Sequence, residues 1–374
     1  MEALPEELIP GDGVLLRRPG PDDVADLVTV GADPLIHRYS PALPSPCTPD
    51  QAREWIAGAL AGTDRYELIV ADPDSGRLLG GCRLYHLSAL DRSGEIGYWV
   101  APGARGRGVA TAATRALTGW AFRHGIGRLE LLTRPDNGPS QRVAVAAGYR
   151  WEGRRRAAEY GRDGSRYDLV AWARLGTDPA GPGPRALPDF PAGRLGDGVV
   201  ELHPVRPDDL AAVTVLRRLP EVVAFSVPPE PPSDERLTAY CTEATSRWLA
   251  GEKLDAAIRD AATGALAGTI QLSGVEPGTG QAMIGYDLHP AWRGRGYATR
   301  AVRLLAGWAF GQAGLARLIA GTAPENAASQ RVLLRAGFER EGYQRSRLPG
   351  AAGTRVDDVL FALLPPQAAS AMTP

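Results

Sequence analysis

The sequence has few of the residues that build disulfide frameworks, metal sites and membrane spans. Its three cysteines, Cys47, Cys82 and Cys241, lie far apart and form no Cys-x-x-Cys pair, so neither a disulfide framework nor a zinc site is expected. No apolar run approaches the ~20 residues of a transmembrane helix. Residues 1–7 are acidic where a signal peptide is basic. These features predict a cytoplasmic protein that binds no metal and no membrane.

Lysine is almost absent, because Lys253 is the only one, and arginine carries nearly all the positive charge. A bias of overall composition explains this better than a functional demand for guanidinium groups. Forty-two basic residues face 43 acidic ones, for a formal net charge of −1. This balance argues against a nucleic-acid-binding protein. With 374 residues, 44% of them hydrophobic, the chain is long enough for more than one globular domain.

What the sequence does contain is an internal repeat. Arg105-Gly106-Arg107-Gly108-Val109-Ala110 recurs as Arg293-Gly294-Arg295-Gly296-Tyr297-Ala298, a separation of 294 − 106 = 188 residues. Each copy follows a short apolar run, at 95–100 and 283–288, and precedes a segment with helical spacing that ends in Gly-Trp-Ala-Phe. One copy would be weak evidence in a chain rich in Arg and Gly, but two copies with matched flanks are strong evidence. Each half is predicted to contain a strand, this loop and a helix.

The remaining elements also come in pairs. Helix starts are predicted at the Pro-Asp-Asp triplets 21–23 and 207–209 and after Thr48 and Ser233, where acidic residues favour a helix N-terminus. Late helices sharing Ser-Gln-Arg-Val are predicted to begin at Ser140 and Ser329 and to stop at Gly148 and Gly337. The other predicted strands are 66–71, 78–84, 128–133 and 166–175 in the first half, and 255–259, 266–272, 317–322 and 355–364 in the second.

A stretch rich in proline and glycine separates the two halves. Residues 177–193 contain five prolines and no periodic apolar pattern, which predicts a semi-rigid linker. The predicted domains are therefore residues 9–176 and 194–365, and the tail 366–374 is predicted to be disordered.

The repeated loop has the chemistry of an anion site. A strand that runs through such a loop into a helix presents consecutive backbone N–H groups at the helix N-terminus, where the helix dipole also favours negative charge. Glycines let the backbone approach a diphosphate closely. The loop has no Gly-Lys-Ser/Thr, so it is not a nucleoside-triphosphate P-loop, and it lacks the glycine spacing of a dinucleotide fold.

With these motifs, each half resembles a GNAT acetyltransferase. The Asn-x-x-Ser pair before the late helix resembles the RimJ/RimL-type branch, whose members acetylate protein N-termini and some small amines. The resemblance implies an α/β protein of two acyl-CoA N-acyltransferase folds in tandem, each a mixed, mostly antiparallel sheet flanked by helices. It implies that residues 105–110 and 293–298 bind the pyrophosphate of acetyl-CoA, the co-substrate. It also assigns cofactor contacts to Asn137 and Asn326, and oxyanion-stabilising backbone N–H groups near Val100 and Leu288.

Candidate catalytic residues follow from the same resemblance. Many GNAT enzymes carry a tyrosine acid seven residues after the Asn, but Ala144 and Leu333 stand there. Ser140 and Ser329 therefore become the candidate proton donors, and helix capping is their alternative role.

Glu95 stands where several GNAT subfamilies have a catalytic glutamate, and it is the candidate base; a solvated glutamate at the strand start is the alternative. The second half has Met283 there. Asp287, on the same strand face, is the candidate substitute, although a structural role fits it better.

The function expected is an acetyl-CoA-dependent N-acetyltransferase. Its acceptor would be a primary amine of a peptide or protein N-terminus, or of a small molecule such as an amino sugar, antibiotic or metabolite, attacking the thioester directly. Two alternatives stay open: a non-catalytic acyl-CoA-binding regulatory module, and one active domain beside a structural pseudo-domain. A monomer and a homodimer are both compatible with the sequence. The segments expected to shape the acceptor pockets, 35–48 and 222–233, do not identify the amine.

Overall fold

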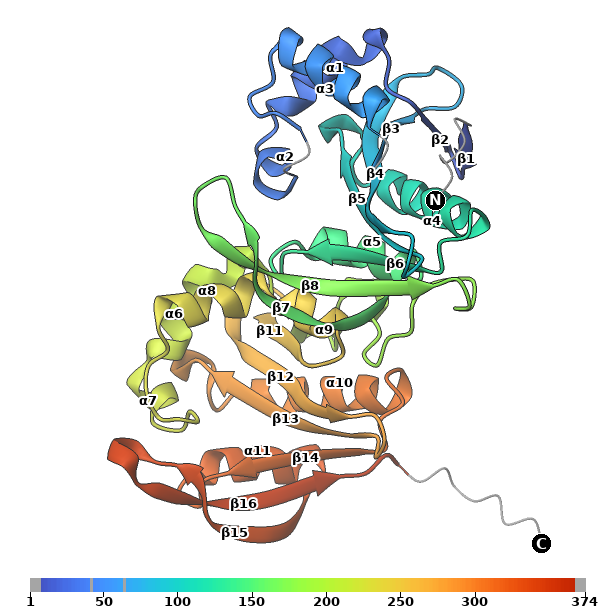
Figure 1. Ribbon diagram of the computed structural model, residues 1–374. Coiled ribbons are helices and arrows are strands. Elements are labelled where there is room, and N and C mark those ends of the chain that lie inside the picture. The colour runs from blue at the N-terminus through green and yellow to red at the C-terminus, as the bar shows by residue number, and fades with distance from the viewer. Residues whose placement is uncertain (1–7, 41–42, 63–64, 367–374) are drawn as a thin grey trace, which may run out of the picture. The chain divides into compact units, whose positions relative to one another are not determined.

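The computed structural model describes residues 8–40, 43–62 and 65–366 and divides the chain into two compact units. Unit 1 is Met1–Pro184 and unit 2 is Arg185–Pro374 (Figure 1). The division falls inside the proline-rich segment 177–193. Of the predicted disordered tail, all but Pro366 lies outside the described residues.

Unit 1 is built on one sheet of eight strands in the order β1-β2-β3-β4-β5-β6-β8-β7. Neighbouring strands are antiparallel, except for the parallel pair β5 and β6. The strands are β1 Ile9–Gly11, β2 Val14–Arg17, β3 Tyr66–Ala71, β4 Leu78–Ser88, β5 Ser93–Val100, β6 Arg128–Thr133, β7 Arg150–Tyr160 and β8 Arg166–Leu175.

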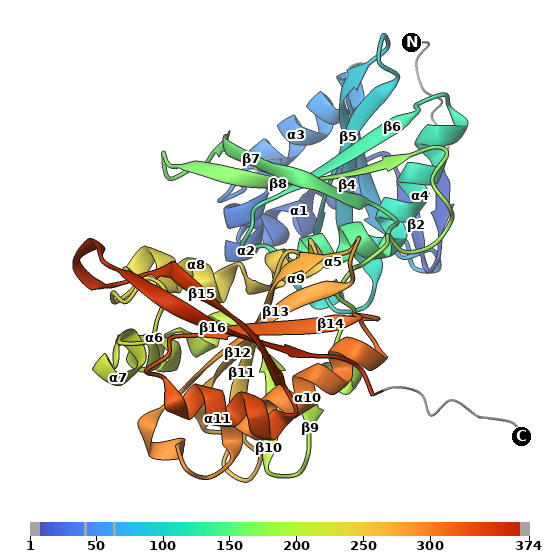
Figure 2. The same cartoon turned by 90° about the horizontal axis from the view of Figure 1, so that it is seen from below.

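Helices cover both faces of this sheet (Figure 2). They are α1 Val24–Gly31, α2 Pro34–Tyr39, α3 Pro49–Ala61, α4 Val109–Arg123 and α5 Gly138–Ala146. Helices α1 to α3 share an apolar cluster with Trp99 of β5. Tyr98, the residue before Trp99, points to the other face of the sheet and contacts Ser140 of α5. Because side chains alternate along a strand, α5 lies on the face opposite to α1–α3.

Unit 2 repeats this architecture, with the strand order β15-β16-β14-β13-β12-β11-β10-β9 and one parallel pair, β13 with β14. Its strands are β9 Leu195–Gly196, β10 Val200–Pro204, β11 Leu254–Asp260, β12 Leu266–Glu276, β13 Gln281–Leu288, β14 Arg317–Thr322, β15 Glu339–Pro349 and β16 Arg355–Leu363. Its helices are α6 Leu210–Arg218, α7 Pro220–Val223, α8 Asp234–Thr242, α9 Ala244–Leu249, α10 Tyr297–Gly311 and α11 Ala327–Ala336. The predicted fold class, two mixed and mostly antiparallel sheets flanked by helices, is confirmed.

The proline-rich segment is packed at both ends. Gly183 donates its backbone N–H to the carbonyl of Val145 in unit 1 (2.7 Å). Further along, Leu187 and Phe190 are buried in the core of unit 2, where the ring of Phe190 lies edge-on to Trp248 and Trp308. Two isolated apolar residues give no periodic pattern, which is why the sequence alone does not show this packing.

Several details of the secondary structure differ from the sequence predictions. The late helices begin at Gly138 and Ala327, before Ser140 and Ser329, because Asn137 and Asn326 provide the caps. Strands β7 and β15 were not predicted. Both are mostly exposed edge strands rich in charged residues, so they lack the alternation that marks a half-buried strand. The short helices α2, α7 and α9 were also missed.

The two units fill equivalent interior positions in different ways. In unit 1 the ring of buried Trp99 lies so close to Gly81 that a Cβ on Gly81 would come within 2.5 Å of it. In unit 2 the positions of this pair are taken by Asp287 and Thr269. The tryptophan therefore requires a glycine across from it.

Replacing Gly81 by threonine, the residue of unit 2, should destabilise unit 1 by about 1–3 kcal/mol, because the new side chain meets the Trp99 ring, which is buried against α1–α3. Urea unfolding of the two proteins measures the change. Gly58→Ala on α3 is the control, since its Cβ would meet nothing within 4 Å and alanine favours a helix. A Gly81→Thr protein as stable as its parent would contradict the packing argument.

Candidate functional site

The centre of each unit is a gap between two parallel strands. Strands β5 and β6 pair only over Ser93↔Arg128, Gly94↔Leu129 and Glu95↔Glu130, although both continue further. Strands β13 and β14 likewise pair over three positions, ending at Met283. Beyond these points one edge of β5 and of β13 is not covered by its parallel neighbour. Such an edge can pair with an extended ligand through its backbone groups.

The predicted oxyanion donors lie on this edge. Ala101 donates its backbone N–H to Leu79 of β4 (2.9 Å), and His289 donates to Ala267 of β12 (2.9 Å). Backbone groups alternate in direction along a strand. The N–H groups of Val100 and Leu288, one residue earlier, therefore face the gap.

The repeated Gly/Arg loop joins each gap to a helix of 15 residues, α4 or α10. Gly108 and Gly296 are the residues before these helices, with φ of +81° and +80°, which a residue with a side chain adopts only under strain. A Cβ at either position would meet nothing within 4 Å. The space above the loop is thus open for a ligand, which the helix N-terminus favours as an anion. The diphosphate of CoA is such an anion, and its binding by residues 105–110 and 293–298 stays a prediction.

The side chains of the loop point in different directions. Val109 and Tyr297 are buried, whereas Arg107 and Arg295 are exposed. Arg105 forms an ion pair with Asp33 (2.6 Å), which also caps α2. A predicted cofactor contact of Arg105 has to share this guanidinium with Asp33.

Arg293 has no carboxylate at the equivalent place. It donates instead to the backbone carbonyls of Leu288 (3.3 Å) and Glu221 (3.4 Å). Both loops are therefore fastened to the short helix nearby, α2 or α7, by different contacts.

Glu95 stands at the last paired position of the gap and has two side-chain partners. Its carboxylate accepts a hydrogen bond from the hydroxyl of Tyr85, directly across on β4, and lies 3.1 Å from Nδ1 of His86. The Glu95 side chain is only 12% exposed. Burial, and then the charge of Glu95, raise the pKa of Tyr85, so this hydroxyl remains a donor. The carboxylate is held in one orientation at the gap.

His86 reaches Glu95 through an unusual backbone conformation. Its φ is +51°, in the left-handed region that costs a residue with a side chain about 1–3 kcal/mol. A bulge between Tyr85 and Ser88 accompanies it. In unit 2 the same three places hold Ser273, Gly274 and Met283, and Gly274 has φ of +56°. Unit 2 thus keeps the bulge and lacks all three side chains.

Ser140 and Ser329 do not cap their helices. Asn137 and Asn326 do so, accepting hydrogen bonds from the backbone N–H of the serines at 3.3 Å and 3.1 Å. The serine hydroxyls lie 2.7 Å and 2.8 Å from the hydroxyls of Tyr98 and Tyr286, which project from the gap strands. Each unit therefore has a pair of hydroxyls beside the gap. Burial raises the pKa of Tyr98, and raises that of Tyr286 to about 12.

Asp287 has structural partners. Its carboxylate lies 3.5 Å from Arg217 of α6 and accepts from the hydroxyl of Thr269 (3.5 Å). It is four residues along β13 from Met283, or about 13 Å at the usual strand rise. These contacts favour the structural alternative, and a catalytic role for Asp287 stays a prediction.

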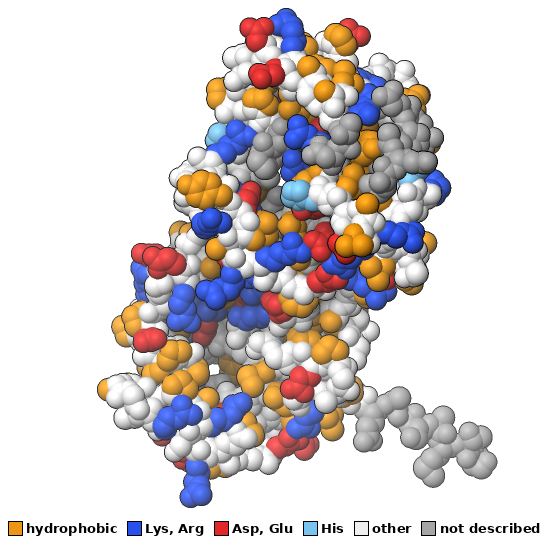
Figure 3. All heavy atoms as spheres, in the orientation of Figure 1, with side chains coloured by type: hydrophobic (Ala, Val, Ile, Leu, Met, Phe, Trp, Pro, Cys, Tyr) orange, Lys and Arg blue, Asp and Glu red, His pale blue; other side chains and the backbone are white. Residues whose placement is uncertain are grey.

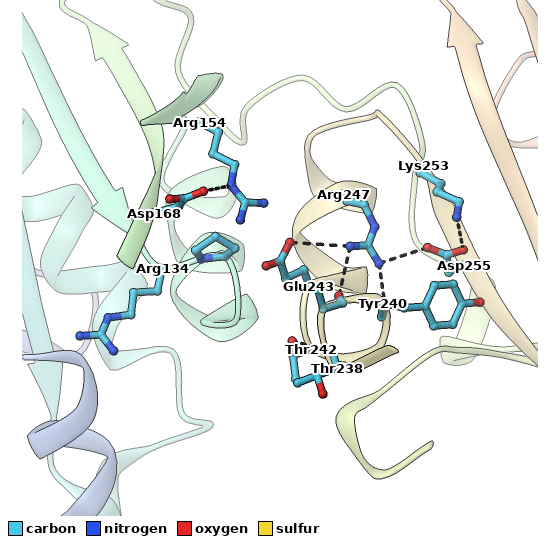
Figure 4. A network of polar contacts seen from close by, with 12 residues as sticks. Arg134, Arg154, Asp168, Thr238, Tyr240, Thr242, Glu243, Arg247, Lys253 and Asp255 are labelled. Carbon is cyan, nitrogen blue, oxygen red and sulfur yellow. Dashed lines mark hydrogen bonds and ion pairs between the residues drawn. The ribbon is translucent and has the colours of Figure 1, made fainter. Parts of the chain in front are cut away.

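A buried acid of unit 2, Asp255, lies on β11, two strands from Asp287 on β13. The side chain of Asp255 is fully buried and forms ion pairs with Lys253 (2.9 Å) and Arg247 (3.4 Å) (Figure 4). Arg247 also donates a hydrogen bond to the backbone carbonyl of Tyr240. Burial lowers the pKa of Lys253, although Asp255 opposes this. The cluster joins α8, α9 and β11 and places no group at the gap.

Metal ligands and membrane spans were not expected. In the described ranges, no three His, Cys, Asp or Glu side chains lie together as a metal site would require. Within the same ranges, no helix is both long and apolar enough to cross a membrane. On the face shown in Figure 3, basic and acidic side chains are interspersed.

One family model matches both units. The family model for the acetyltransferase (GNAT) domain matches residues 14–150 and again residues 200–339. These two matches cover most of the chain. The chain belongs to the acetyltransferase (GNAT) family. As a member of this family it is an acetyltransferase, and the resemblance inferred from the loop and helix motifs is confirmed.

Curated relatives are similar in sequence to part of this chain. "Probable N-acetyltransferase YjcK" of Bacillus subtilis is 38% identical over 126 residues, which are 33% of this chain and 69% of that protein. "Putative ribosomal N-acetyltransferase YdaF" of the same organism is 35% identical over 101 residues, 27% of this chain and 55% of that protein. The chain thus spans about two thirds of the length of one relative and about half of the other.

Solved structures also resemble the chain. RimJ of Mycobacterium smegmatis, in complex with CoA-disulfide, is 26% identical, with 46% of this chain and 84% of that chain covered and a TM-score of 0.41. The ribosomal-protein-S5-alanine acetyltransferase of Vibrio fischeri is 19% identical, with 46% and 96% covered and a TM-score of 0.42.

Some residues of the candidate site could not be identified from the sequence. Tyr85 and His86 sit on the strand before the gap strand, and only pairing across β4 and β5 brings them to Glu95. Tyr98 and Tyr286 had a visible signal, since the dipeptide Gly-Tyr occurs at the same place in both repeats.

The buried acid of unit 2 offers a stability test. Asp255→Asn keeps the shape but leaves Lys253 and Arg247 without their anion, so unfolding free energy should fall by about 3 kcal/mol or more. Urea unfolding measures it. Asp234→Asn is the control: that carboxylate pairs with Arg218 but is 82% exposed, so its loss should cost at most about 1 kcal/mol. Equal effects of the two substitutions would contradict the role given to Asp255.

Proposed function

We propose that the chain transfers the acetyl group of acetyl-CoA to a primary amine of a protein or peptide N-terminus or of a small molecule, and that unit 1 performs the transfer. The observation that carries this is Glu95, held at the apex of the gap by Tyr85 and His86. The relative YdaF is named a putative ribosomal N-acetyltransferase, which favours a protein amine within this class.

Glu95 acts as the base. An amine is protonated at neutral pH and has to lose a proton before it can attack a carbonyl carbon. The carboxylate faces α1–α3, on the same side of the sheet as Trp99, so the acceptor enters from that side. Tyr85 and His86 fix the carboxylate, and the proton passes to Glu95 directly or through water. Bound acetyl-CoA supplies the activated acetyl group as a thioester.

The backbone of β5 stabilises the developing negative charge. The N–H of Val100 faces the gap and donates to the acetyl carbonyl oxygen, the usual role of such a preorganised donor. In this proposal the loop residues 105–110 hold the diphosphate, and Asn137 orients the helix that borders it. In unit 2, residues 293–298, Asn326 and the backbone N–H of Leu288 are assigned to cofactor binding.

Ser140 and Tyr98 return a proton to the leaving sulfur. Their hydroxyls lie 2.7 Å apart beside the gap, so a proton given by one can be replaced from the other. A tyrosine hydroxyl is protonated at neutral pH, and burial raises the pKa of Tyr98 further. In unit 2 Ser329 and Tyr286 form the same pair.

The rival function is an acyl-CoA-binding module without transfer. It predicts that acetyl-CoA binds but that added amines release no CoA thiol. A thiol-release screen over N-terminal peptides, amino sugars, polyamines and aminoglycosides separates the two functions and identifies the acceptor.

Glu95→Gln should lower kcat by about 100-fold or more, since general base catalysis contributes about that much. CoA affinity, measured by calorimetric titration, should not change. Met283→Gln places the same side chain at the twin position in unit 2 and serves as control, with undiminished turnover expected. Thiol release that is unaffected by Glu95→Gln would move the transfer to unit 2.

His86→Gly should change stability and activity in opposite directions. Glycine adopts φ of +51° without strain, whereas the lost contact with Glu95 comes from a side chain that is 75% exposed and contributes little to folding, so the unfolding free energy should rise by up to about 1 kcal/mol. At the same time kcat should fall about tenfold, the loss of one hydrogen bond to a charged group, with KM for acetyl-CoA unchanged. His86→Asn, which tolerates this backbone and keeps a donor, should recover part of kcat. A variant that gains stability and keeps full kcat would show that His86 does not position Glu95.

A further inference from the structure

Unit 2 has a basic pocket that begins at its Gly/Arg loop. The pocket has a volume of about 520 Å³, and its lining includes Asp197, Gly296, Thr299, Arg300, Arg303 and Arg335. Thr299, Arg300 and Arg303 lie on one side of α10, at spacings of three and four residues from one another or from Gly296, the residue before the helix. Arg335 comes from the last turn of α11. The pocket thus extends from the Gly/Arg loop for about 10 Å along the helix, at the usual rise per residue.

Three arginines make this pocket suited to phosphate. A guanidinium group pairs with phosphate through two parallel hydrogen bonds. Arg303 is braced, because it donates to the backbone carbonyl of Arg335. Arg300 forms an ion pair with Asp197 (2.8 Å), and its side chain is 45% exposed. A ligand that fits has one anionic group at the loop and a second one further along α10.

Unit 1 lacks most of this charge. Arg115 takes the place of Arg303 and donates in the same way to the carbonyl of Ala146 (2.7 Å). Because both units make this contact, it shows which positions correspond. Ala146 of unit 1 is at the position of Arg335, and Ala112 is at the position of Arg300. Unit 1 therefore keeps one of the three guanidinium groups.

The groups for acetyl transfer are distributed the other way. Unit 1 has Glu95, Tyr85 and His86 at its gap, whereas unit 2 has Met283, Ser273 and Gly274. The arginines that can bind phosphate are thus in unit 2, and the carboxylate that can accept a proton is in unit 1.

We propose that unit 2 is a CoA-holding site that does not transfer acetyl groups, and that Arg300, Arg303 and Arg335 bind the 3′-phosphate of the CoA nucleotide. This rests on the proposed function, in which both loops hold the diphosphate. It predicts unequal affinities: unit 2 binds CoA more tightly than unit 1, and only unit 2 distinguishes CoA from 3′-dephospho-CoA. Asp197 competes with the phosphate for Arg300.

Calorimetric titration of the full chain with CoA and with 3′-dephospho-CoA tests this. The parent protein should show two binding steps, and loss of the 3′-phosphate should weaken the tighter step by about tenfold or more, as removal of charge-assisted hydrogen bonds does. Arg300→Ala with Arg335→Ala, the residues of unit 1, should weaken the tighter step for CoA equally and abolish the difference between the ligands. Asp197→Asn should tighten it.

Arg340→Ala with Arg345→Ala is the matched control. It removes the same charge from β15, outside the pocket, and should leave both steps unchanged. The reverse exchange, Ala112→Arg with Ala146→Arg, should make unit 1 sensitive to the 3′-phosphate. Two steps that are equal for both ligands, or an Arg300/Arg335 variant that binds as the control does, would overturn the proposal. Absence of any CoA binding would refute the proposed function itself.

Discussion

The parting of two parallel strands after three residue pairs is the constraint on which the site depends. It uncovers one backbone edge of β5, so that Val100 faces open space, and it leaves Glu95 at the point where pairing stops. Because β5 and β6 are parallel, both end at the same side of the sheet. The Gly/Arg loop after β5 and the Asn137 turn after β6 therefore lie on opposite sides of the gap. Helix α2 contacts both sides, through Asp33 with Arg105 and through Arg38 and Tyr39 with Asp136.

Much of the architecture could be predicted from the repeat alone. A glycine-rich loop between an apolar strand and an amphipathic helix has few backbone solutions, and two copies confirm one another. Residues whose role depends on neighbours distant in sequence could not be found this way. His86 lies near Glu95 only because of a bulge in β4, and Arg105 meets Asp33 across 72 residues. The exposed strand β7 gives no periodic signal, because its neighbour covers one edge and solvent covers its faces.

The two units show that one backbone accepts different interiors when the changes are made together. Trp99 with Gly81 in unit 1 corresponds to Asp287 with Thr269 in unit 2, where Arg217 supplies the countercharge. A large ring needs an empty place opposite, and a half-buried carboxylate needs a cation. Either change made alone is expected to cost stability. Glu95, Tyr85 and His86 also differ as a group, because unit 2 has Met283, Ser273 and Gly274 at the three positions. Without the carboxylate, the two residues that bind it have no partner there.

The ion pair of Lys253 with Asp255 has a consequence for an enzyme that modifies amines. Lys253 carries the only side-chain amine in the sequence, and it is 24% exposed and bound to a fully buried carboxylate. Arginine is not an acceptor under these conditions, because its guanidinium remains charged. Acetylation of the folded protein by itself would therefore find a single, mostly buried lysine side chain, and the charge of the arginine side chains would not change.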